Sequence, residues 1–391
     1  GSLFQLAAIA SGCEETVPDE ATLVVNRATP GMLGFGLVEA IPDAQIAALE
    51  DPTDANNDGI SGRVHWVTAA EDDTDQLRAG RFGWKSIVAT VLTFSGDAGK
   101  NELGLTNALF PEENAPNGDI KRLELCDDVA DPEDHPDSEG FTFIERVTHF
   151  QRFLAAPPQT PKSGMSGETI AEAAGCFACH HAAAYTIPND PLLEEAIRGK
   201  TIKAYSDFLL HDVGLLGDGL PQGDAGGNEF RTTPLMGMRD RDFFVHDGRI
   251  GSGTFEDRVR AVIAAHGPYG EGAASALAFD ALPSDDQTSL IAFLDSLGRR
   301  EFDFDGDKNV DFDDYVIFIT CSYTDDVISP DDTCAIGDID QNGLIDNVDF
   351  EAFILAYEGI DRDCDCDGES NLTEIANGAL DMNADGVPDD C

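Results

Sequence analysis

Two cysteines and one histidine form the arrangement in this chain with the most specific chemistry. The run Cys176-Phe177-Ala178-Cys179-His180 has the spacing C-x-x-C-H. With this spacing, two thiols can add to the two vinyl groups of a haem while the adjacent imidazole binds the iron. A redox pair or half of a zinc site also uses C-x-x-C, but the His that follows and the lack of a second C-x-x-C argue against both. The motif predicts a covalent haem c, with Cys176 and Cys179 as thioether anchors and His180 as proximal ligand.

The second axial ligand is not determined by this motif. Small cytochromes often use a downstream Met, which here would be Met236 or Met238. An open sixth position is a further alternative. Three histidines also lie downstream, and each could instead be a buried, hydrogen-bonded side chain or a contact to a haem propionate: His211, His246 and His266.

Acidic residues recur at every second position in the segment 301–391. Calcium loops place oxygen ligands at positions 1, 3, 5, 7, 9 and 12, with Gly at position 6. Three stretches fit this register and a fourth runs in it to the C-terminus, although Lys308 replaces the Gly of the first loop. A hydrated acidic tail needs no such register, so we expect Ca²⁺ binding. The matching residues are Asp303, Asp305, Asp307, Asn309, Asp311 and Asp314; Asp338, Asp340, Asn342, Asp346 and Asp349; Asp363, Asp365, Asp367, Asn371 and Glu374; and Asp381, Asn383, Asp385 and Asp389.

A shorter acidic cluster lies near the start of the chain. Asp54, Asn56 and Asp58 precede Gly59 and reproduce half of a calcium loop. We expect a calcium site there, with an Asx-rich turn as the alternative.

Charge and cysteine content restrict the compartment and the partners. The 391 residues carry a formal net charge of −51. A field of this sign repels phosphate backbones, so nucleic acid is excluded as a partner. No apolar run reaches about 18 residues, so no membrane span is expected. Haem c attachment and disulfides both require an oxidising compartment, so the protein is expected to be periplasmic or extracellular.

Three segments are expected to position these residues. We predict a mixed, loop-rich N-terminal segment over 1–161, a mostly helical haem domain over 162–300 and a small α-helical module over 301–391. Apolar residues recur at helical spacing in several places. The predicted helices cover 81–94, 141–154, 168–176, 191–211, 254–266, a segment after Ser284, 315–320 and 350–357.

Several short blocks between residues 13 and 300 resemble the di-haem oxidoreductase family. These peroxidase-like proteins, also called thiol oxidoreductase-like, are related to bacterial cytochrome c peroxidases and to MauG. The resemblance implies a mainly α fold with a cytochrome c-like haem domain. The spacing of the first two acidic loops, which end in Asp, also resembles dockerin repeats more than sensor EF-hands. The blocks are GFGLVEAIPD from Gly34, GISGR from Gly59, RFGWK from Arg81, LELC from Leu123, AYSDFLLHDVG from Ala204, RTTPL from Arg231 and HDGR from His246.

The resemblance also indicates a distal ligand. In that superfamily an axial ligand follows the His-Asp-Gly histidine at a shorter interval than the one from His246 to His266 here. Some of the residues that lengthen this interval lie in the loop 250–253, and the others add about one turn to the helix that follows. One full turn returns the ligand position to the same face of that helix. We therefore favour His266 over the methionines, and expect His246 and Arg249 to hold a propionate.

The family carries two haems, whereas this sequence has one C-x-x-C-H motif. We expect either that a second motif lies upstream of Gly1 or that the second haem has been lost. The function expected is peroxidase-like electron transfer with a redox partner protein or a small-molecule oxidant. Alternatives are a pure electron carrier, or a component docked to an assembly through 301–391.

Three disulfides are also expected. They are Cys13–Cys126, Cys321–Cys334, and Cys391 with either Cys364 or Cys366. Cys321 and Cys334 flank a short loop between the first two acidic repeats, where a crosslink suits a module with little core.

Overall fold

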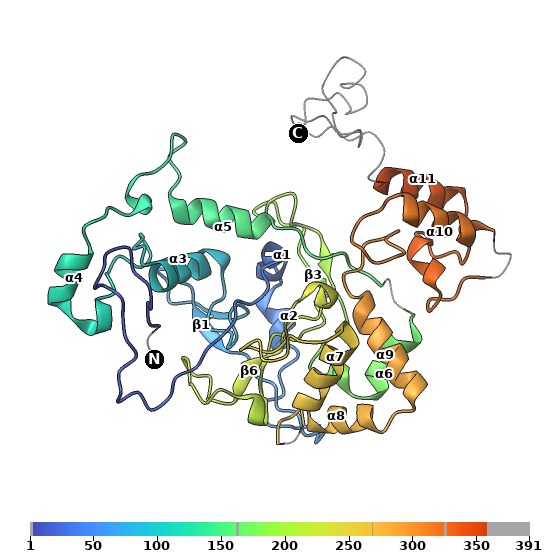
Figure 1. The fold of residues 1–391 in the computed structure, drawn as a ribbon, viewed down its shortest axis with the longest axis horizontal. Helices are drawn as coiled ribbons and strands as arrows, with labels where there is room; N and C mark the ends of the chain where they lie inside the picture. The colour runs from blue at the N-terminus through green and yellow to red at the C-terminus, as the bar shows by residue number, and fades with distance from the viewer. Residues whose placement is uncertain (1–2, 162–163, 268, 324–326, 358–391) are drawn as a thin grey trace, which may run out of the picture. The chain divides into compact units, whose positions relative to one another are not determined.

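The structure is a computed structural model that describes residues 3–161, 164–267, 269–323 and 327–357. Within these ranges helices are the commonest regular structure, accompanied by three small antiparallel two-stranded sheets and long connecting loops (Figure 1). The helices are α1 (Phe35–Glu39), α2 (Asp43–Ala47), α3 (Val91–Leu103), α4 (Ile120–Cys126), α5 (Phe143–Phe153), α6 (Ser166–Ala173), α7 (Phe255–Ala265), α8 (Ala273–Asp280), α9 (Ser284–Ser296), α10 (Phe312–Ser322) and α11 (Asn347–Ala356). The strand pairs are β1 (Trp66–Thr68) with β2 (Leu77–Ala79), β3 (Tyr185–Thr186) with β4 (Thr201–Ile202), and β5 (Leu210–Asp212) with β6 (Glu229–Arg231).

The chain divides into two compact units. The first comprises Gly1–Pro157, Ala171–Met236 and Asp240–Gln287, and the second comprises Pro158–Ile170, Gly237–Arg239 and Thr288–Cys391. The predicted boundaries at 161 and 300 stay predictions. No described helix is both long enough and apolar enough to cross a membrane.

Aromatic packing and one buried cation organise the core of the first unit. The ring of Phe35 lies 4.6 Å from that of Phe82 and 5.7 Å from that of Phe94. Arg81 is fully buried, and its guanidinium donates to the carbonyl oxygens of Val38 and Ile41, near the end of α1. The Val38 carbonyl also accepts the Ile41 amide at 3.3 Å, so the cation adds a partner to carbonyl groups at a buried helix end, where unsatisfied polar groups would be costly.

Six of the eight predicted helices agree with a helix of the structure and two do not; the predictions over 168–176, 315–320 and 350–357 overlap α6, α10 and α11. The predictions over 141–154, 254–266 and the segment after Ser284 correspond to α5, α7 and α9. The prediction over 81–94 was wrong at its start, because Phe82 instead pairs with Val88 and the helix begins after Thr90, whose hydroxyl accepts from the Thr93 amide.

The predicted helix over 191–211 was also wrong. Tyr205 and Phe208 adopt left-handed backbone angles, with φ of +51° and +61°, which a right-handed helix does not permit. The segment instead supplies β4 and β5.

The second unit contains two repeats, each an acidic loop followed by one helix, and the two helices share an aromatic core. The rings of Phe318 on α10 and Phe353 on α11 lie 4.8 Å apart, and the two helices lie side by side in Figure 1. Both helices begin with the same capping box, made by an Asp at the cap and another three residues later. The two repeats therefore have the same local structure.

Two predicted cysteine pairs lie at disulfide distance. The sulfur atoms are 2.00 Å apart in Cys13–Cys126 and 1.97 Å apart in Cys321–Cys334. The predicted pairing of Cys391 lies outside the described residues.

Candidate haem site

The C-x-x-C-H motif forms a tight turn directly after α6. Gly175, with φ of +82°, ends the helix, and Cys176–Ala178 form a single 3-10 turn. The His180 amide donates to the Cys176 carbonyl at 3.0 Å, which gathers both thiols and the imidazole on one turn. Neither Cys176 nor Cys179 is in a disulfide, and burial raises the pKa of the Cys176 thiol to about 11. The thiols are thus held together and protonated.

The backbone fixes the orientation of the His180 ring. Its Nδ1 atom lies 3.1 Å from the carbonyl oxygen of Tyr205. A carbonyl only accepts, so Nδ1 carries the proton and the lone pair is on Nε2. Burial, together with a smaller effect of His266, lowers the pKa of His180 to about 4. His180 is therefore a neutral imidazole with Nε2 ready to bind a metal.

His266 has the same arrangement at the end of α7. Its Nδ1 atom lies 2.7 Å from the Val262 carbonyl, and burial lowers its pKa. Gly272 packs against this ring, because a Cβ atom there would lie 3.0 Å from the His266 Cδ2 atom. His180 and His266 are thus both neutral imidazoles whose Nδ1 proton is held by a backbone carbonyl, which leaves Nε2 as the ligand atom. Together with two unlinked thiols, this donor set fits a covalently attached, six-coordinate haem.

The methionine alternatives lie in other surroundings. Met236 is 8% exposed and belongs to the apolar core that contains Phe35 and Phe82. Met238 is also buried, and it belongs to the second compact unit.

His246 and Arg249, which were expected to contact a propionate, lie in the same loop between β6 and α7. The His246 ring is buried, 4.5 Å from the ring of Phe230 and edge-on to Trp84. Arg249 forms an ion pair with Asp247 at 2.6 Å. A propionate would have to share that guanidinium with Asp247, and the predicted role stays a prediction.

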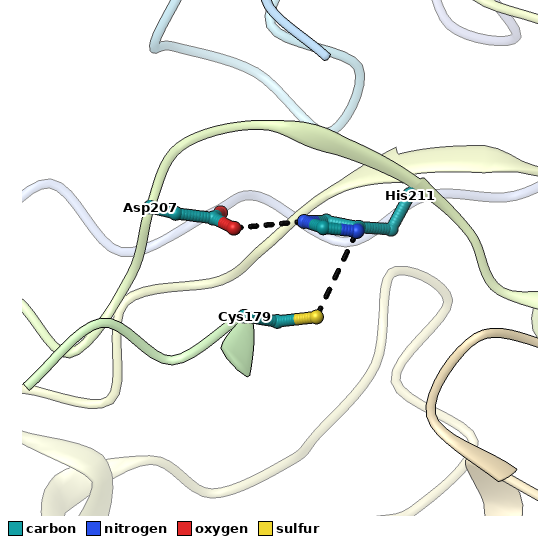
Figure 2. Close-up of side chains that lie close together, drawn as sticks. All are labelled: Cys179, Asp207 and His211. Atoms are coloured by element: carbon teal, nitrogen blue, oxygen red, sulfur yellow. Dashed lines mark hydrogen bonds and ion pairs between the residues drawn. The ribbon is translucent and has the colours of Figure 1, made fainter. Parts of the chain in front are cut away.

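A buried charge cluster adjoins the haem motif. His211 Nε2 lies 2.8 Å from an Asp207 carboxylate oxygen, and His211 Nδ1 lies 2.7 Å from one of Glu271. The same Nδ1 lies 3.7 Å from the sulfur of Cys179, so the ring stands between Asp207 and Cys179 (Figure 2). Burial alone would lower the pKa of His211, but these hydrogen bonds outweigh burial and raise the pKa to about 12.

This cluster was not predicted from the sequence, which suggested His211 only as one of several downstream histidines. The signal that could have found it is the four-residue spacing of Asp207 and His211 in one of the family-like blocks. Ligand atoms of Cys179, Asp207 and His211 lie within 4.8 Å of one another, a spacing that a metal could bridge only if His211 lost a proton.

In each of the first two acidic loops, several carboxylates lie close together. Ligand oxygens of Asp303, Asp305, Asp307 and Asp314 lie within 4.8 Å of one another, and so do those of Asp338, Asp340 and Asp349. At position 12, Asp314 and Asp349 are each fully buried, and they accept three and two backbone amides, respectively. Burial raises the pKa of both carboxyls.

The two loops also share backbone geometry at positions 4 and 6. Gly306 and Gln341 have φ of +83° and +59° at position 4, and Lys308 and Gly343 have φ of +81° and +83° at position 6. Lys308 thus adopts the turn normally assigned to Gly. The predicted third and fourth loops lie outside the described residues.

The Asp54 cluster forms an Asx-rich turn. Asp54 accepts the amides of Asp58 and Gly59, and Asn56 also accepts the Asp58 amide. These bonds occupy oxygens of the predicted ligands, and the calcium prediction there stays untested.

The comparison with protein families identifies the class. Residues 10–297 match the family model described as "Di-haem oxidoreductase, putative peroxidase", so the chain belongs to the di-haem oxidoreductase family. Membership implies a haem cofactor and places the C-x-x-C-H motif inside the matched region. No curated protein matches the chain significantly.

Proposed function

We propose that this chain is a secreted c-type cytochrome oxidoreductase of peroxidase-like type. Its haem would be attached to Cys176 and Cys179, with His180 and His266 as axial ligands. The observation that carries the proposal is the pair of neutral imidazoles, each holding its Nδ1 proton on a backbone carbonyl and leaving Nε2 as the ligand atom, with His180 on the turn that also carries the two free thiols. A bound haem would supply one-electron chemistry at its iron.

The protein's own groups would orient and insulate that centre. The Tyr205 carbonyl sets the His180 tautomer, and the Asp207 amide donates to the Cys179 carbonyl at 3.0 Å. Burial keeps both imidazoles neutral, which is the form that binds iron. The disulfide-distance cysteine pairs support a periplasmic or extracellular location, and thioether attachment of the proposed haem would require such a location.

A pure electron carrier is the second candidate, and one observation favours it. Two histidines suited to the iron would leave no open position for peroxide, so this haem would pass electrons without meeting the oxidant itself. Peroxide chemistry would then occur elsewhere, with this centre accepting electrons from a redox partner protein.

Anaerobic peroxide titration distinguishes the two candidates. The dithionite-reduced holoprotein would be mixed with hydrogen peroxide while its visible spectrum and peroxide consumption are followed, with a Cys176→Ser/Cys179→Ser variant as the haem-free control. Repeated turnover with an electron donor supports the peroxidase-like function. Exchange of electrons with a small cytochrome but no peroxide turnover supports the carrier, and a centre that does neither contradicts both.

We also propose that the two described acidic loops bind Ca²⁺. Their support is the convergence of carboxylates in each loop and the common left-handed turns at positions 4 and 6. Oxygen-only ligands in this register suit a hard divalent cation. Isothermal titration of the full chain with Ca²⁺ tests this, and no heat from a metal-free sample would contradict it.

A further inference from the structure

We propose that Asp207, His211 and Glu271 form a fixed negative charge that lowers the reduction potential of the haem. This inference rests on the proposed haem site at Cys179 and His180. It assigns to the three residues an electrostatic role, in which their charge acts on the cofactor from the protein segments that hold it.

The charge of the cluster follows from its hydrogen bonds. Both nitrogens of His211 face carboxylate oxygens, at 2.8 Å for Asp207 and 2.7 Å for Glu271. Ionised carboxylates only accept, so both nitrogens must donate and the ring is an imidazolium. One cation between two anions gives the cluster one net negative charge.

The cluster is held rigidly in place. Ser61 donates to Glu271 at 2.6 Å, and the Leu209 amide donates to Asp207 at 2.9 Å. Gly62 lies flat against the imidazole, because a Cβ atom there would come within 2.6 Å of the His211 Cε1 atom. With His211 and Asp207 6% and 2% exposed, the charge can neither rotate away nor be screened well by water.

The cluster contacts both segments that carry the proposed iron ligands. On one side, His211 lies 3.7 Å from the Cys179 sulfur, next in sequence to His180. On the other side, Glu271 belongs to the segment after α7, where the next residue, Gly272, packs against His266. The charged cluster therefore contacts the protein segments that would surround the haem.

A buried negative charge favours the more positive state of a nearby redox centre. Ferric haem carries one more positive charge than ferrous haem, so the cluster stabilises the ferric form and lowers the reduction potential. The N–H···S contact opposes this effect only weakly, because a thioether sulfur is a poor acceptor.

The test is the midpoint potential of the holoprotein, measured by spectroelectrochemistry. Glu271→Gln keeps the side-chain shape and removes one negative charge, and Asp207→Asn makes the same change on the other side of the ring. Both variants should give a positive shift in midpoint potential with the haem still low-spin. Glu256→Gln is the matched control, because it removes an exposed carboxylate from α7 and should cause no comparable shift.

Each outcome decides a different point. Unchanged potentials in both charge variants, with only a lower melting temperature, would mean that the cluster is a structural clamp and would overturn the inference. If Glu271→Gln fails to fold, the shift in Asp207→Asn decides, since the inference requires the same sign there. Absence of covalent haem in the unmodified protein would instead contradict the proposed function itself.

Discussion

The Nδ1 atom of His180 lies 3.1 Å from the carbonyl oxygen of Tyr205, a residue whose own backbone is left-handed, with φ of +51°. A left-handed non-glycine residue costs about 1–2 kcal/mol, so the surrounding contacts must hold it there. The turn aims a carbonyl at the imidazole and thereby selects the tautomer with a free Nε2. Local backbone geometry in this way prepares the histidine of the C-x-x-C-H motif as a ligand.

We predict that the haem is low-spin with His180 and His266 as ligands, and that His266→Ala converts the optical spectrum to high-spin. Removing the imidazole leaves the sixth position to water or to nothing, which weakens the ligand field. Absorption and electron paramagnetic resonance spectra of the ferric protein measure the change.

The control is His181→Ala, which removes the histidine next to His180 whose ring lies against Tyr185. That variant should keep the low-spin spectrum. A low-spin spectrum that survives in His266→Ala would exclude His266 and favour Met236 or Met238.

The haem motif and its surroundings differ in how far the sequence predicts them. Cys176, Cys179 and His180 are adjacent in sequence, so their spacing alone indicates the chemistry. Glu271, one of the two carboxylate partners of His211, lies 60 residues away from it in the sequence. No local sequence pattern indicates that these two side chains are in contact. Long-range contacts of single side chains depend on the whole packing, which periodicity does not encode.

Helix predictions failed for a related reason. Residues 191–211 contain enough apolar side chains for a helix, but Tyr205 and Phe208 take left-handed angles to reach the haem motif and the core. Tertiary contacts override local propensity in that segment. By contrast, α7 begins with a capping box at Thr254, which is a local signal that can be recognised in the sequence.

We predict that chelation unfolds the described part of the C-terminal module and leaves the haem spectrum intact. Without a cation, carboxylates within 4.8 Å of one another repel, and the small core around Phe318 and Phe353 must resist that repulsion alone. At a calcium concentration 100 times the Kd, each site would contribute about 2.7 kcal/mol. Circular dichroism and limited proteolysis of the full chain, with and without chelator, measure the effect.

Asp314→Asn and Asp349→Asn should weaken calcium binding, because each removes a buried position-12 carboxylate. Asp313→Asn, at the exposed neighbour, is the matched control. Protease resistance that persists in chelator would contradict the metal requirement.

The same two carboxylates predict an unusual pH dependence. Burial raises the pKa of Asp314 and of Asp349, so the folded module binds protons more readily than the unfolded chain. Stability in the absence of calcium should therefore rise as pH falls from 7 into the window between the raised pKa and the ordinary aspartate value of about 4. Melting curves at several pH values would show it.

With calcium bound, the sign should reverse, because the cation favours the ionised carboxylates and protons then compete with it. Equal pH dependence with and without calcium would argue that these carboxylates are not ligands.

We predict that Lys308→Gly stabilises the module by about 1 kcal/mol. Lys308 has φ of +81°, a conformation that glycine adopts without a Cβ clash, and the second loop has Gly343 at the same position. Thermal unfolding in calcium measures the gain. Lys308→Ala is the control, since alanine retains the Cβ atom, and an equal gain in both variants would trace the effect to the lysine side chain instead of the backbone.

The central claim is that this chain carries a covalent haem on Cys176 and Cys179. The intact mass of the protein, produced in cells with c-type haem maturation and then denatured, tests it most directly. We predict a mass equal to the polypeptide plus one haem, and loss of that addition in Cys176→Ser/Cys179→Ser. A mass equal to the polypeptide alone, in cells that mature a control cytochrome c normally, would contradict the account.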